Sequence, residues 1–62
     1  MVNDTEWLKR MISHHSTALT TSHKILSRTH NLEISKLASD IIDTQEREIS
    51  LMKKILANNI SK

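Results

Sequence analysis

The chain contains no glycine and no proline, and its apolar residues recur in steps of three and four. That spacing follows the 3.6-residue turn of an α-helix, whereas a half-buried strand would alternate apolar and polar residues. A β protein also needs turn residues and aromatic side chains, but this chain has a single Trp and neither Tyr nor Phe. The sequence therefore predicts an all-α protein.

The apolar series is interrupted once, by the polar segment 27–31. Asn3 and Asp4 are good helix caps near the start of the chain, and Asn31 is the best cap in its interior. We therefore predict one domain over residues 1–62, with a helix at about 4–28, a turn at about 29–31 and a second helix at about 32–58. So short a turn between helices of similar length makes an antiparallel hairpin.

A hairpin of two helices cannot cover both of its apolar stripes. A chain of this length buries only roughly 60% of its unfolded surface, and it has no cysteine with which to form a disulfide. The simplest closure is a four-helix bundle made from two hairpins. We therefore expect a homodimer, with a tetramer as an open possibility.

The charge pattern argues against two classes of partner. The net charge is only +2, and acidic and basic residues are interspersed, which is typical of a solvated face. No apolar run approaches the roughly 18 residues of a membrane span, so we expect a soluble chain, and as written it shows no signal peptide. Nucleic-acid binding is therefore a weak alternative for the function. It would rest on four basic residues, Lys9, Arg10, Lys53 and Lys54.

Three polar residues interrupt the apolar stripes that should face inward. At about 100° per residue, His15 lies near the centre of the first stripe, Gln45 lies in the middle of the second and Glu48 lies on its flank. In an antiparallel hairpin these three come to a similar height. Met11 and Met52 lie about one turn closer to the open end, and His14 lies at the edge of the stripe. The band therefore contains His14, His15, Gln45, Glu48, Met11 and Met52.

Two hypotheses account for this band. Imidazole, carboxylate and thioether groups that project into a bundle core can bind a transition metal, and this mixture suits copper above most alternatives. Alternatively, a hydrogen-bonded network of His15 with Gln45 or Glu48 satisfies these groups without metal and fixes the register of a dimer. We expect no enzyme, because no Glu is followed three residues later by the His that a ferritin-like di-metal site uses.

Two segments of the chain carry a family resemblance. In residues 4–19 an acid and an aromatic residue precede Met11-Ile12-Ser13-His14-His15 and Ala18. A matching second half runs through Asn31-Leu32-Glu33, Leu37-Ala38, Ile41-Ile42, Gln45, Glu48-Ile49 and Met52. In this order and spacing, over about residues 4–56, the chain resembles the family catalogued as domain of unknown function 305.

The resemblance implies a ferritin-like four-helix architecture, in which many members carry two hairpins in one chain. Some members are implicated in binding copper or other metals, often outside the cytoplasm. Carried over by position, the implied ligands are His14, His15, Glu48 and Met52, with Gln45 supporting them. The chain departs from the family pattern at Ser13, where Pro is usual, and at Thr21, where a Met is usual.

Overall fold

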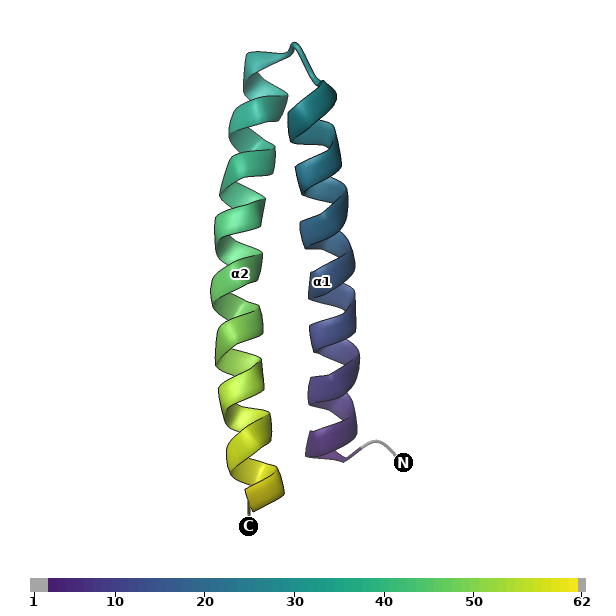
Figure 1. Ribbon diagram of the computed structural model, residues 1–62, viewed down its shortest axis with the longest axis vertical. Helices are drawn as coiled ribbons and strands as arrows, with labels where there is room; N and C mark the ends of the chain where they lie inside the picture. Colours follow the sequence, from purple (N-terminus) through teal and green to yellow (C-terminus); the bar gives the residue numbers. More distant parts are fainter. Residues whose placement is uncertain (1–2, 62) are drawn as a thin grey trace.

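The structure is a computed structural model that describes the backbone of residues 3–61 and the side chains of residues 3–59. Two helices, α1 (Asp4–Arg28) and α2 (Leu32–Ser61), lie antiparallel and side by side in a rod of 47 × 20 × 13 Å (Figure 1). The predicted all-α antiparallel hairpin is confirmed. Helix α2 continues to Ser61, beyond the end that we predicted near residue 58.

Asparagine side chains cap the N-termini of both helices. The Asn3 Oδ1 atom accepts a hydrogen bond of 2.9 Å from the backbone N–H of Glu6. The Asn31 Oδ1 atom accepts two, from Glu33 N–H at 2.9 Å and from Ile34 N–H at 3.1 Å. Each cap satisfies N–H groups that have no carbonyl partner in the first turn of a helix. The caps therefore define where each helix begins.

The turn between the helices needs no glycine. Thr29 has extended backbone angles (φ −76°, ψ 144°), and none of the described residues has a positive φ. The Thr29 N–H donates to the carbonyl of Ile25, which closes the end of α1. The Thr29 Oγ1 atom then accepts from the N–H of Asn31 and braces the turn. Side-chain hydrogen bonds thus replace the left-handed residue that commonly ends a helix.

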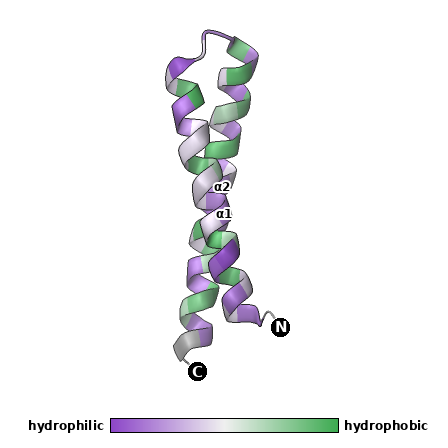
Figure 2. Ribbon diagram, turned by 90° about the vertical axis from the view of Figure 1, so that its right-hand side faces the viewer, coloured by the Kyte–Doolittle hydropathy of each residue, from purple (hydrophilic) through white to green (hydrophobic). Residues whose placement is uncertain are grey.

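The core is a single seam between the two helices. Its main cluster is Leu8, Ile49 and Met52, in the half toward the open end, and Ile42 and Ala38 continue the seam along α2 toward the turn. Hydrophobic segments recur at intervals along both helices, which is the pattern expected for one buried stripe on each (Figure 2). Ser22 of α1 is also buried.

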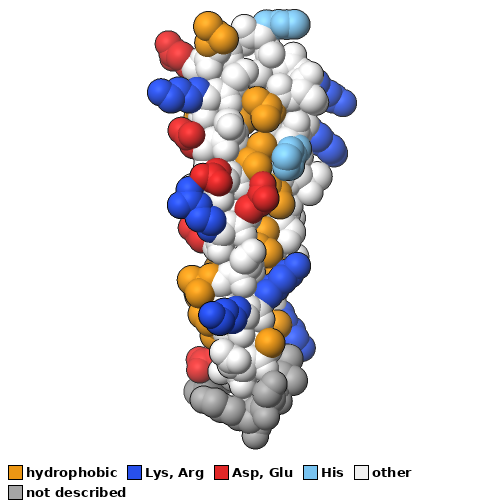
Figure 3. Space-filling view, turned by 60° about the vertical axis from the view of Figure 1, so that its left-hand side comes forward, with side chains coloured by type: hydrophobic (Ala, Val, Ile, Leu, Met, Phe, Trp, Pro, Cys, Tyr) orange, Lys and Arg blue, Asp and Glu red, His pale blue; other side chains and the backbone are white. Residues whose placement is uncertain are grey.

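Much of the apolar surface stays uncovered. No described side chain is fully buried, and six of the exposed large hydrophobic residues are at least 40% exposed: Trp7, Ile25, Leu32, Leu37, Leu51 and Ile55. On the face drawn in Figure 3, a line of hydrophobic side chains follows the groove between the helices, with charged side chains on both sides. At the open end the half-exposed Trp7 borders a shallow hollow that it shares with Ile55. A single hairpin therefore leaves part of the apolar surface of both helices in contact with water.

The cap of α2 gives a first prediction. We expect Asn31→Ala to lower the free energy of unfolding by about 1 kcal/mol, because two N–H groups lose their acceptor. Thermal and urea unfolding followed by circular dichroism measures this difference. Asn58→Ala is the matched control, since Asn58 is an exposed asparagine near the other end of α2, far from the Asn31 cap. Equal stability of the two variants would contradict the role given to Asn31.

Candidate metal centre

The centre of the predicted band is a contact between the two helices. The Nε2 atom of His15, on α1, lies 2.5 Å from the Oε2 atom of Glu48, on α2. The two residues are 33 positions apart in the chain, so only the folded hairpin brings them together. The sequence predicted that His15 meets Gln45 or Glu48, and the structure selects Glu48.

A second hydrogen bond determines which ring nitrogen of His15 faces Glu48. The Nδ1 atom of His15 lies 2.8 Å from the carbonyl oxygen of Met11, one turn earlier in α1. A carbonyl oxygen only accepts, so Nδ1 carries the proton and donates it. The Nε2 atom is thereby directed at Glu48. Histidines that bind metals are commonly oriented by the same kind of bond to a carbonyl.

The pair lies at the border of the core and remains accessible. The side chain of His15 is 22% exposed and that of Glu48 is 48% exposed. Because Glu48 lies on the flank of the stripe on α2, its side chain reaches His15 along the edge of the interface rather than through it. An ion or a second protein can approach from this side. The chemistry of the pair is therefore open to a ligand.

The two methionines lie together, as their common height predicted. Met52 is buried in the central cluster with Leu8 and Ile49, and Met11 packs against that cluster. Both side chains thus fill the core beside the His15–Glu48 pair. The Met11 residue has a second role, since its backbone carbonyl orients the His15 ring.

The other two candidates stand apart from the pair. The half-buried Gln45 has an Oε1 atom that is shielded from solvent and accepts no hydrogen bond from the residues that the structure describes. Of the two partners that the sequence left open for His15, the structure therefore pairs it with Glu48 and not with Gln45. His14 is exposed on the neighbouring face of α1, about 100° from His15. Its ring makes no hydrogen bond to the other candidate side chains in the described part of the chain.

Within the residues whose side chains are described, no three His, Asp or Glu groups converge on one point. His15 and Glu48 supply two such groups, and stable sites for transition metals generally use three or four protein ligands. The sulfur and amide groups near the pair are those of Met11, Met52 and Gln45.

Neither helix, over the residues described, has the length and hydropathy to cross a membrane.

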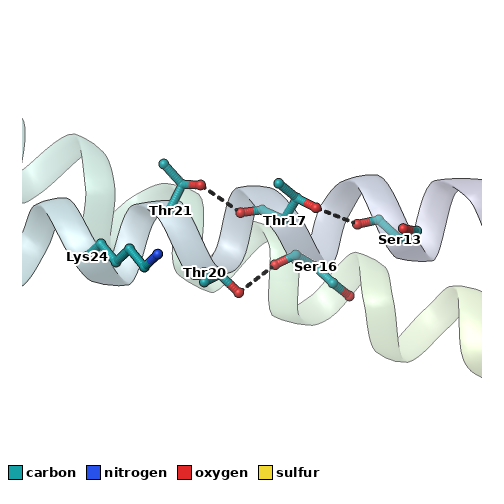
Figure 4. A pocket seen from close by; sticks show the side chains of 6 residues that line it. All are labelled: Ser13, Ser16, Thr17, Thr20, Thr21 and Lys24. Atoms are coloured by element: carbon teal, nitrogen blue, oxygen red, sulfur yellow. Dashed lines mark hydrogen bonds between the residues drawn. The ribbon is translucent and has the colours of Figure 1, made fainter.

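One surface of α1 was not predicted from the sequence. A shallow groove on its outer face is lined by Ser13, Ser16, Thr17, Thr20, Thr21 and Lys24 (Figure 4). The Thr17, Thr20 and Thr21 hydroxyls each donate to the carbonyl four residues earlier, at 2.9–3.1 Å. The signal was a run without Lys, Arg, Asp or Glu from Met11 to His23. Because the three threonine hydroxyl protons are used inside the helix, the donors that line the groove are the Ser13 and Ser16 hydroxyls and the Lys24 ammonium group.

Comparisons with known proteins place this hairpin among relatives. Residues 2–59 match the family described as domain of unknown function (DUF305). An uncharacterized protein of Acanthamoeba polyphaga mimivirus is 46% identical to the chain over 55 residues. The aligned part covers 89% of this chain but 36% of that protein, so the chain spans little more than a third of this relative's length. No solved structure matches the chain.

The exposure of the pair predicts that it adds little to stability. We expect a double-mutant cycle of His15→Ala and Glu48→Ala to give a coupling free energy of at most about 1 kcal/mol, as for other accessible ion pairs. Urea unfolding of the four proteins measures it. Glu46→Ala is the control, because Glu46 is exposed and lies on the same helix without a contact to His15. A coupling of several kcal/mol would instead identify the pair as a structural element.

Proposed function

The chain belongs to the family described as domain of unknown function (DUF305), as the resemblance predicted, and we propose that it binds a transition-metal ion, copper foremost, without catalysing a reaction. The observation that carries the proposal is the orientation of His15. Its Nδ1 proton is held by the Met11 carbonyl, and its Nε2 atom faces the carboxylate of Glu48. A nitrogen and an oxygen ligand from two helices thus meet at one accessible point.

The change that the pair must undergo to hold an ion is small. Bonds from zinc to imidazole nitrogen and carboxylate oxygen are about 2.0–2.2 Å long, so the two atoms must separate to about 3 Å. They are 2.5 Å apart in the structure. A rotation of the half-exposed Glu48 side chain supplies this separation. The His15 Nε2 atom and the Glu48 carboxylate would then hold the ion.

The choice of copper rests on the donors next to the pair. Thioether sulfur from Met52 and Met11 selects Cu(I), and imidazole also suits copper. The Gln45 amide oxygen, which accepts no hydrogen bond from the described residues, supports the site. Thr21 lacks the thioether usual at its position in the family pattern, so the methionines near the pair supply the sulfur.

We further propose that two hairpins associate as a homodimeric, ferritin-like four-helix bundle. The exposed apolar side chains of both helices support this, because a second hairpin would remove them from water. A second copy would also bring another set of donors close to the first. In particular, the exposed His14 becomes available as a ligand to an ion held by its neighbour.

The alternative function is a metal-free dimerisation or adaptor module. One observation favours it: His15 and Glu48 already satisfy each other, and no third His, Asp or Glu joins them among the described residues. Under this alternative, a chelator leaves the melting temperature of the protein as isolated unchanged, and added metal does not raise it. Under the metal hypothesis, bound ion stabilises the folded state by mass action.

Calorimetric titration with Cu(I), Cu(II) and Zn(II) tests the proposed function. We expect saturable binding that His15→Ala weakens by about tenfold or more, because the oriented nitrogen ligand is lost. Glu48→Gln should weaken binding in the same direction, since it keeps the side-chain length and removes the charge.

The control for the titration is His23→Ala, because His23 is another exposed histidine of α1. This variant should bind like the unchanged protein. If the double variant His14→Ala/His15→Ala binds each metal as tightly as the unchanged chain, the proposed site is wrong.

A further inference from the structure

Helix α2 carries a second apolar seam beside the one that packs on α1. Its positions alternate in steps of three and four from residue 34 to residue 55, which is a heptad pattern. Leu37 and Leu51 are each 57% exposed, so α1 does not cover this seam. Thr44 and Glu48 occupy two of its seven positions, and the other five are the apolar residues Ile34, Leu37, Ile41, Leu51 and Ile55.

Four charged residues follow the border of this seam. Glu33, Asp40, Arg47 and Lys54 recur at every seventh position, so they lie in one row along the helix. All four are exposed. At about 100° per residue, the row borders the seam on the side away from α1. The row is acidic in the first half of α2 and basic in the second.

We propose that this seam binds the same seam of a second copy of the chain, with the two α2 helices antiparallel. This inference rests on the self-association proposed above and specifies its surface and orientation. In an antiparallel pair of helices, the two rows face each other. Glu33 then meets Lys54 of the second copy, and Asp40 meets Arg47 of the second copy. Both pairings centre between Asp43 and Thr44, so one register satisfies both.

A parallel copy would leave these charges without partners. In a parallel pair, each row faces the opposite border of the partner's seam, which is the border that packs on α1. That border carries Ala38, Gln45 and Met52, which have no charge. The row of α2 is therefore self-complementary in the antiparallel orientation alone. Charges at the rim of an interface mainly select orientation, and the apolar seam supplies affinity.

Two existing contacts are compatible with this arrangement. Arg47 pairs with Asp43 on the same helix, but its guanidinium has five donors, which suffice for a second carboxylate. Glu48 lies within the seam, and its carboxylate turns toward His15. Its methylene groups are then left to contact the second copy. The interface therefore passes beside the proposed metal site.

Exchanging charges along the row tests the orientation. We expect the unchanged chain to sediment at twice its 7.1 kDa mass. Glu33→Lys/Asp40→Lys makes the row entirely basic, and Arg47→Glu/Lys54→Glu makes it entirely acidic. Each variant should raise the dimer dissociation constant by about tenfold or more through like-charge repulsion. A 1:1 mixture of the two should associate again.

The fourfold variant that combines all these substitutions is the matched control. It reverses every charge, keeps the row self-complementary and should dimerise within about threefold of the unchanged chain. Circular dichroism checks that each variant remains helical. If the unchanged chain dimerises and the two single-sign variants dimerise equally well, the inference fails while the proposed self-association stands. A monomeric unchanged chain, with or without metal, overturns both.

A distance measurement tests the orientation independently of charge. The chain has no cysteine, so Asn58→Cys gives a single site for a spin label near the end of α2. In the antiparallel dimer the two labels lie about 40 Å apart, at 1.5 Å per residue. A parallel dimer would bring them within roughly 20 Å, which would overturn the inference.

Discussion

Two helices packed along one seam can bury only one stripe on each, and this limit governs the rest of the structure. The buried residues form a single row from Leu8 to Ala38, and none of the described side chains is fully enclosed. Everything outside the row, including the His15–Glu48 pair and the second seam of α2, remains at the border of the core or in solvent. The proposed metal site and the proposed pairing through the second seam both use residues at the border of the core. The pair is accessible because only one seam is buried, and the second seam is exposed for the same reason.

The positions of the two helices could be predicted from the sequence, because they depend on residues close together in the chain. The steps of three and four determine two helices, and the carboxamide of Asn31 determines where the second begins, because capping depends on residues within one turn. The end of α2 was less predictable. No glycine or proline follows residue 58, so nothing local stops the helix before Ser61.

Tertiary detail could be predicted only in part. An antiparallel hairpin brings His15 level with both Gln45 and Glu48, and the choice between them depends on the rotation of α2 and on side-chain reach, which periodicity does not contain. The second seam escaped prediction for a related reason. The apolar residues of α2 form one wide stripe in the sequence, and only the packing of α1 reveals which half is covered.

In the proposed site a metal attaches to the Nε2 atom of His15. Nitrogen-15 NMR of the four imidazole rings during titration with diamagnetic Zn(II) or Cu(I) tests this directly. We predict that the His15 Nε2 resonance shifts by far the most, while Nδ1 keeps its proton through the bond to Met11. Equal shifts of all four rings, or a response confined to the exposed His23 and His30, would contradict it.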